Sequence, residues 1–226
     1  MTDLAGLTRL FSWLSPSFPI GGFAYSQGLE TAIVRGEVRD GETLYAWIAG
    51  QLHRGGMRND AMFLSIAARA VRDDDRAGYM HAAGFCLALQ FSAERDKETR
   101  EQARSFIISA AAWPASIPDW LDASLAAPIA LPIAFGALAS VHGVPILPAA
   151  SGFLNAAAAQ QISVGVRLIP LGQSTGLAVQ AGLERDIIAL AEAVQDAGLD
   201  DVAALSPGAD IASLVHEDLN VRIFRS

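Results

Sequence analysis

The sequence predicts an all-α protein, and three observations carry this prediction. Apolar residues recur at helical spacing, turn residues separate pieces of helix length, and the alternating runs typical of half-buried strands are hard to find. Hydrophobic residues make up 52% of the 226 residues, which is enough to bury a sizeable core. We therefore expect a single globular domain over residues 1–226, with roughly eight to ten helices and no sheet.

Two apolar stripes show the helical spacing, and turn signals bound them. Both stripes repeat every three or four residues, as one face of an amphipathic helix does. The first is Leu44, Trp47, Ile48 and Leu52, and the second is Met62, Phe63, Ile66, Ala67, Ala70 and Val71. Breaks are expected at 15–22, 36–41, 55–56, 73–75, 114–118, 145–148, 170–172 and 206–208, where Gly, Pro, Ser or Asp gather.

Residues 89–112 are expected to form one long, highly charged helix. Acidic and basic side chains recur there three and four positions apart, as Asp96 and Arg100 do. Such pairs usually lie on a face that water covers. We therefore expect a helix with a solvated charged face.

A stretch without charged residues runs from Ala123 to Val166 and has to be tested as a membrane segment. A spanning helix needs about 20 predominantly apolar residues. Pro128, Pro132, Pro145 and Pro148 interrupt this stretch, and Asn155, Gln160 and Gln161 dilute its second half. We expect two closely packed core helices rich in Ala and Gly instead of a membrane hairpin. Small residues also suit a self-association surface, so a homodimer is expected.

Charge and cysteine content limit the partners and the compartment. The formal net charge is −8, which opposes binding to nucleic acid because that binding relies on counterion release. Cys86 is the single cysteine and cannot form an internal disulfide. The first residues, with Asp3 and Arg9, lack the basic and uninterrupted apolar regions of a signal peptide. We expect a cytoplasmic protein without nucleic-acid or membrane partners.

Catalytic motifs are weak in this sequence. Lys97 is the single lysine and lies between two acidic residues, so a phosphate-binding loop is excluded. Residues 24–28 differ from the Gly-x-Ser-x-Gly nucleophile motif at the first glycine, and no strand is expected before Ser26. Ser26 is instead expected to cap the helix that runs toward Val34. The sequence predicts that the protein is not an enzyme, with a serine hydrolase using Ser26 as the alternative.

The histidines do not form a readable metal site. His53, His81, His142 and His216 have no spacing that would put two ligands on one helix face. We expect no resident metal and no cofactor. His216 next to Glu217 could contact a metal ion transiently through its imidazole, although a histidine near a helix end is often structural.

Two segments are candidates for binding another protein. Residues 15–30 combine two prolines, three glycines and three aromatic residues in one turn that leads into a helix. A rigid turn of this kind loses little entropy on binding. Residues 216–226 place two arginines and two large apolar residues near the chain end, where polar residues are usual. Arginine and aromatic residues are favoured in interface hot spots. Each segment could equally be a rigid connection or a docked end.

These two segments resemble signature stretches of the UreF family of urease accessory proteins. The opening Ser-Pro…Pro-x-Gly-Gly-Phe-x-Tyr-Ser-x-Gly-Leu-Glu and the closing Arg-Ile-Phe-Arg-Ser carry the resemblance, with residues 167–173 between them. A looser similarity lies at residues 97–100. One departure is Leu219, which stands where the family usually has glutamine after His-Glu-x.

The resemblance implies an all-helical, dimeric scaffold for urease maturation. It implies a complex with the accessory protein UreD, called UreH in some organisms, which recruits the GTPase UreG and acts on apo-urease. Nickel would pass through internal channels of this complex and would not be a tightly bound cofactor. The alternative is a regulator of GTP hydrolysis by the partner, with Arg167 as an arginine donor.

The resemblance also assigns expected site residues. It implies that the tail 216–226 becomes ordered when a partner binds. No residue is expected to be catalytic and none to hold a metal. The expected partner-binding residues are Gly21, Gly22, Tyr25, Arg167, Gln173, His216, Arg222, Phe224, Arg225 and Ser226.

Overall fold

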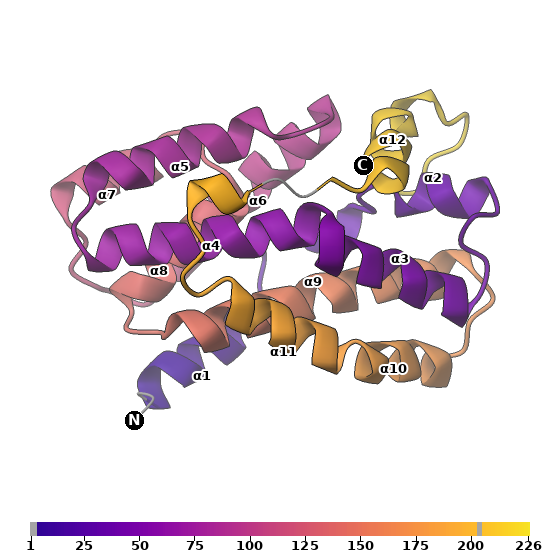
Figure 1. Cartoon of the computed structure of the whole chain (residues 1–226), viewed down its shortest axis with the longest axis horizontal. Coiled ribbons are helices and arrows are strands. Elements are labelled where there is room, and N and C mark those ends of the chain that lie inside the picture. Colours follow the sequence, from indigo (N-terminus) through magenta and orange to yellow (C-terminus); the bar gives the residue numbers. More distant parts are fainter. Residues whose placement is uncertain (1–3, 203–204) are drawn as a thin grey trace.

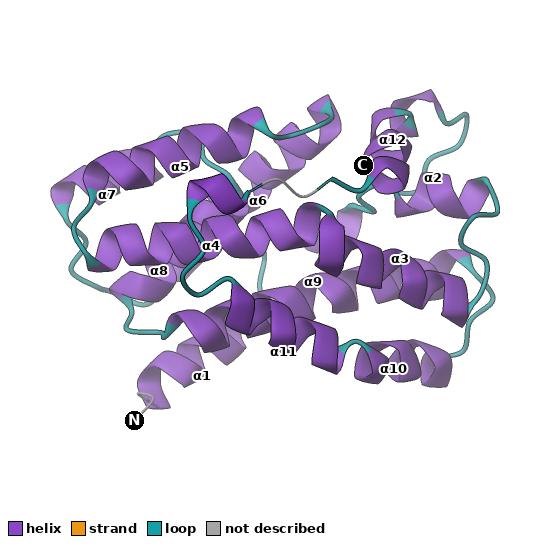
Figure 2. Ribbon diagram, viewed as in Figure 1, coloured by secondary structure: helices purple, strands orange, loops and turns teal. Residues whose placement is uncertain are grey.

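The computed structural model describes residues 4–202 and 205–226, and in this part of the chain the all-α prediction is confirmed. It holds twelve α-helices and three short 3-10 helices, and no strand occurs among the described residues (Figure 2). The helices outnumber the expected eight to ten because several are short. The six-residue Leu29–Val34, the seven-residue Asp119–Leu125 and the eight-residue Pro207–Leu214 are examples.

The helices follow one another in the order of Figure 1. They are α1 (Leu4–Trp13), η1 (Gly22–Ala24), α2 (Leu29–Val34), α3 (Gly41–Arg54), α4 (Gly56–Arg72), α5 (Arg76–Ala88), α6 (Ala93–Ala110), α7 (Asp119–Leu125), α8 (Leu131–Val141), α9 (Ile146–Leu168), α10 (Gln173–Gly182), α11 (Glu184–Ala193), η2 (Leu199–Asp201), α12 (Pro207–Leu214) and η3 (His216–Asp218).

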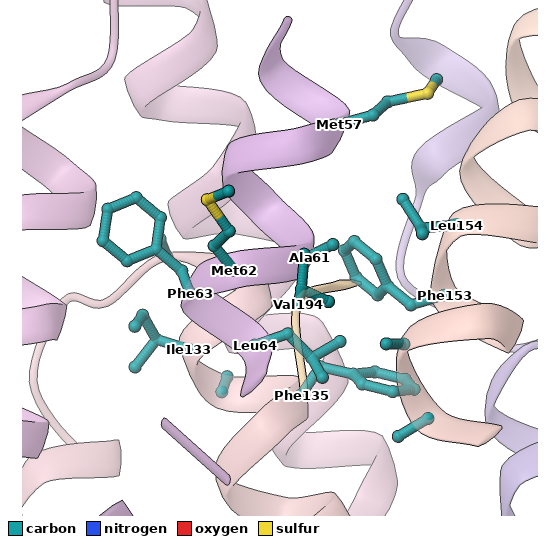
Figure 3. Packing of buried hydrophobic residues seen from close by; sticks show 14 of the residues in the cluster. Met57, Ala61, Met62, Phe63, Leu64, Ile133, Phe135, Phe153, Leu154 and Val194 are labelled. Carbon is teal, nitrogen blue, oxygen red and sulfur yellow. The ribbon is translucent and has the colours of Figure 1, made fainter. Parts of the chain in front are cut away.

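Helix α4 is the central element of the core. It packs against α3, α5, α8, α9 and α11 (Figure 1). Met62 and Phe63 of the predicted stripe are buried there with Ile133 and Phe135 of α8 (Figure 3). A helix that contacts neighbours on most of its sides must be buried around most of its circumference, and residues 61–68 of α4 are all buried.

Local signals explain where several helices start. The Asp40 side chain accepts a hydrogen bond from the Thr43 N–H at 2.8 Å, which caps α3. Ser92 caps α6 in the same way by accepting from the Arg95 N–H at 3.1 Å. The predicted break at residues 55–56 is confirmed, since α3 ends at Arg54 and α4 begins at Gly56.

The charge-free stretch forms the end of α7 and the two core helices that were predicted, α8 and α9. Pro132 and Pro148 lie in the first turns of these helices, where a missing N–H costs no helical hydrogen bond. None of the helices within residues 4–202 and 205–226 is both long enough and apolar enough to span a membrane.

The charged helix differs from the prediction in two ways. It begins at Ala93 instead of residue 89, because Ser92 caps it. Its face is also not fully solvated, since Glu98, Thr99 and Gln102 are buried. The expectation failed because residues far away in sequence cover this face of α6. Gln27 of the turn and Ser226 of the tail contact Glu98, and the Thr99 hydroxyl accepts from the Leu131 N–H of α8.

Candidate partner-binding site

The segment between α1 and α2 is a fixed turn built by glycines. Gly21 (φ 75°) and Gly28 (φ 82°) adopt the left-handed conformation at either end of η1 and its following loop, which glycine adopts without steric cost. Gly22 lies close to α9. A Cβ at Gly22 would lie 2.9 Å from the Gln160 side chain, so the turn approaches α9 closely.

Side chains of α9 hold the main chain of this turn. Gln160 Nε2 donates to the carbonyls of Gly22 (2.7 Å) and Tyr25 (3.2 Å). Gln161 Nε2 donates to the Ser26 carbonyl at 2.9 Å. Arg167, near the end of α9, donates to the Phe23 carbonyl at 3.2 Å. These bonds satisfy carbonyls that the non-helical turn leaves without partners, so α9 fixes the shape of the turn.

The C-terminal tail lies on the turn and pairs with its main chain. The N–H of Arg225 donates to the Ala24 carbonyl at 2.8 Å, and the N–H of Ser26 donates to the main-chain oxygen of Ser226 at 2.7 Å. Glu30 of α2 accepts from the N–H groups of Ile223 (2.8 Å) and Phe224 (3.1 Å). Turn and tail therefore form one hydrogen-bonded unit, which we call the tail–turn unit (residues 21–30 and 216–226).

Carboxylates of α6 anchor the side chains of the tail. Glu98, fully buried, accepts from the Ser226 hydroxyl at 2.8 Å and pairs with Arg95 at 2.7 Å. Glu101 lies 3.3 Å from Arg225 and accepts from the Tyr25 hydroxyl at 2.6 Å. Hydrogen bonds to charged groups are the stronger kind, so α6 contributes much of the attachment.

The last four residues of the tail, 223–226, alternate between exposed and buried side chains. Phe224 is 4% exposed beneath Arg167, whose guanidinium lies 4.6 Å from the ring centroid, and Ser226 is fully buried. Ile223 and Arg225 point the other way and are exposed. This two-residue period is that of an extended chain with one covered face. The outward face is the part that another protein can reach.

His216 secures the start of the tail. Its imidazole is fully buried, with Nε2 2.9 Å from Glu30 and Nδ1 2.8 Å from Glu94 of α6. Arg222 contacts the other oxygen of Glu94 at 2.9 Å. The adjacent Glu217 is exposed and does not share these contacts. Both ring nitrogens of His216 are thus occupied by carboxylates.

The cap prediction for Ser26 is confirmed only in part. The N-cap of α2 is Gly28, but the Ser26 hydroxyl still accepts from the Glu30 N–H in the first turn of α2 at 3.4 Å. The same buried hydroxyl donates to the main-chain oxygen of Ser226, 200 positions away, which the sequence alone could not show. Because Ser26 is fully buried and no strand precedes it, the geometry of a nucleophile motif is not present.

Burial shifts two titratable groups in and beside the site. Burial and the Glu101 carboxylate raise the pKa of Tyr25 to about 12, so its hydroxyl keeps its proton at neutral pH. Burial raises the pKa of Asp60 of α4 to about 6, although Arg95 lies 4.0 Å away. Asp60 and Arg95 also line a cavity of about 520 Å³ that has the turn as one wall and Trp13, Phe106, Phe135 and Phe153 among its apolar lining.

The structure brings most of the expected site residues together. Nine belong to the tail–turn unit or contact it, namely Gly21, Gly22, Tyr25, Arg167, His216, Arg222, Phe224, Arg225 and Ser226. Gln173 is instead an exposed residue at the start of α10. His216, Phe224 and Ser226 are buried, so in this arrangement they can position the surface but cannot touch a partner.

Several residues that build the site were not expected from the sequence. Glu30, Glu94 and Glu98 bind the tail, and Gln160 and Gln161 hold the turn. A signal existed in the charge-free stretch, where two adjacent glutamines are unusual on a core helix.

The contacts that order the tail here all come from the chain itself, and ordering by a partner stays a prediction. Among the described residues, no group of three or more His, Cys, Asp or Glu side chains is suited to hold a metal ion.

Comparison with known proteins places the chain in a family. The UreF family model matches residues 38–184. A protein of Rhodopseudomonas palustris (strain BisB5) is 41% identical over 223 residues, which cover 98% of this chain and 92% of that protein. A protein of Rhizobium etli is 42% identical over 224 residues, which cover 99% of this chain and 98% of that protein. Both carry the name urease accessory protein UreF. This similarity extends along nearly the whole chain, including the turn and the tail, and we conclude that the chain belongs to the UreF family.

Proposed function

We propose that this protein acts in the maturation of urease as a non-catalytic adaptor in the cytoplasm. The tail–turn unit would bind a UreD- or UreH-like accessory protein, and that complex would bring the GTPase UreG to apo-urease for nickel insertion. Nickel is the cargo of this assembly, passing through it without becoming a resident cofactor. Membership of the UreF family and the name of its relatives support the role in urease maturation.

One observation supports the tail–turn unit as the binding surface. It exposes large apolar side chains although its main chain is held rigidly: Phe23 is 73% exposed, Val221 77% and Ile223 69%. The side chain of Arg225 is 55% exposed beside them. Apolar groups with an arginine on a pre-formed surface bind a partner with little ordering cost. We propose a homodimer as the working form of the adaptor, with this surface free in each copy.

The proposal is tested by removing the exposed apolar groups without touching the buried anchors. We expect Val221→Asp combined with Ile223→Asp to weaken capture of the UreD-like partner by about thirtyfold or more, the effect of losing an interface hot spot. Urease activity in a reconstituted system with UreG and nickel should fall with it. The control is Phe11→Asp on α1, a similarly exposed apolar residue (70%) outside the unit, which should leave capture unchanged.

Two results would contradict the proposal. Unchanged capture by the doubly substituted protein would mean that the tail–turn unit is not the binding surface. Urease activation that does not depend on this chain would remove the role in maturation altogether.

A further inference from the structure

The contacts of His216 require one more proton than a neutral imidazole carries. Nδ1 and Nε2 both lie within hydrogen-bond distance of carboxylate oxygens, at 2.8 Å from Glu94 and 2.9 Å from Glu30. A neutral imidazole donates from one nitrogen and accepts at the other, whereas a carboxylate only accepts. Two hydrogen bonds therefore need a second proton, placed on the imidazole or on one of the carboxyl groups.

The charges around His216 point to the same conclusion. Glu30 faces it from α2 and Glu94 faces it from α6, and both side chains are largely buried. Arg222 of the tail neutralises one of these two negative charges. The charged residues of η3 itself, Glu217 and Asp218, are exposed. A protonated His216 makes this buried group electrically neutral, and loss of its proton leaves a buried negative charge without a partner.

Glu30 links this proton to the tail. The oxygen of Glu30 that contacts His216 also accepts from the Phe224 N–H, and its other oxygen accepts from the Ile223 N–H. Without the second proton, Glu30 or Glu94 faces the lone pair of a ring nitrogen. This repulsion acts either on Glu30, which holds the main chain of the tail, or on Glu94, which holds Arg222.

We propose that His216 is a positioning residue that holds the tail on the turn only while the site keeps its second proton, which makes the partner-binding surface sensitive to pH. This inference rests on the proposed function for its biological meaning. Docking of the tail would weaken as the pH rises and the site gives up this second proton. Since one proton is involved, the docking equilibrium can change by at most about tenfold per pH unit.

Two isosteric substitutions separate this mechanism from a merely structural role. In Glu94→Gln, the amide NH₂ can donate to Nδ1 while its oxygen still accepts from Arg222, so a neutral His216 suffices. In Glu30→Gln, an amide NH₂ takes the place of one carboxylate oxygen. In one orientation it faces the imidazole and the Phe224 N–H, and in the other it faces the Ile223 N–H. In both orientations a donor meets a main-chain donor. We therefore expect Glu94→Gln to keep the tail docked at every pH and Glu30→Gln to release it.

The experiment is amide hydrogen exchange on the full chain from pH 6 to pH 9, corrected for the intrinsic pH dependence of exchange. Protection of residues 221–226 should fall by about tenfold or more in the wild type, while protection of α4 in the same samples stays constant. Glu94→Gln should remove the pH dependence. A wild-type tail whose protection does not change with pH, or a Glu94→Gln protein that keeps the wild-type pH dependence, overturns the proposal.

Capture of the UreD-like partner by the same proteins separates this inference from the proposed function. Capture that follows tail protection across pH supports both. If tail protection follows pH as expected while capture does not follow the tail, the proton-dependent attachment stands and the proposed binding surface fails.

Discussion

At the scale of single residues, backbone conformation decides how the turn enters α2. Gln27 (φ 56°) and Gly28 (φ 82°) are consecutive residues in the left-handed region, and they reverse the chain between Ser26 and Leu29. The sequence predicted a rigid turn here from its prolines and glycines. It could not show that Gly28 also packs directly against the main chain of α12, because that approach depends on a helix 180 residues later.

Gly28→Ala should therefore destabilise the protein more than a left-handed glycine elsewhere. A Cβ at Gly28 would lie 2.7 Å from the Ser213 main-chain nitrogen. Conformational strain and overpacking together should therefore lower the free energy of unfolding by about 2–5 kcal/mol. Gly36→Ala is the control, since Gly36 has φ 74° but open space around it, and should lose about 1–2 kcal/mol. Urea unfolding of both variants measures the difference, and equal losses would show that α12 can move aside.

At the scale of elements, sequence periodicity identified the main helices but not their neighbours. The stripes on α3 and α4 were expected, because burial on one face leaves a spacing that can be read along the chain. The pair α8 and α9 was expected from a charge-free stretch rich in small residues and interrupted by prolines. The burial of Glu98 was not expected, because a charged helix looks the same in sequence whether water or a distant tail covers it. Pairing between elements also depends on small residues at the contact. At Gly136 of α8, a Cβ would lie 2.1 Å from the Leu64 carbonyl oxygen of α4.

Gly136→Ala should separate α4 from α8 and lower the free energy of unfolding by about 2 kcal/mol or more, since a rigid main chain blocks the added methyl group. The matched variant is Gly84→Ala on α5, where the position is exposed and nothing lies within 4 Å. It should raise stability by up to about 1 kcal/mol through helix propensity. Thermal unfolding followed by circular dichroism compares the two. Stabilisation by both substitutions would refute the close approach of α4 and α8.

At the scale of the whole molecule, the tail–turn unit brings residues 21–30 together with the C-terminal residues 216–226 over one face of the helical core. The sequence singled out the two segments separately as candidate binding segments, and the structure brings residues 21–30 and 216–226 together. Their supports on α6 and α9 could not be predicted, because they depend on the three-dimensional path of the chain. Beside this surface lies a small group of charges, the buried Glu98 and the half-buried Arg95 and Asp60, from which we expect an effect on the stability of the whole fold.

Asp60 should make global stability depend on pH between about 4 and 6. Its pKa is raised from 3.8 to about 6 in the folded protein, so the folded state binds the proton more tightly than the unfolded chain. The protonated Asp60 makes its full contribution to the free energy of unfolding at a pH below 3.8, the pKa of the unfolded chain. This contribution falls by about 3 kcal/mol as the pH rises through about 6, the pKa of the folded protein.

Asp60→Asn should remove this loss, matching the wild type near pH 4 and exceeding its stability near pH 7. Urea unfolding from pH 4 to pH 7 tests this expectation. Parallel stability curves for the two proteins would mean that Asp60 keeps its ordinary acidity when folded.

The hydrogen bonds between turn and tail also have a kinetic consequence. Ser26 and Ser226 are 200 residues apart, and the bonds from Glu30 to the tail span 193 and 194 residues. Contacts between such distant residues form late, because the chain between them must first be ordered. The helices around α4 bury their apolar surface without the tail. The tail should therefore be the last segment to join during folding, and it can leave and return many times while the core stays folded.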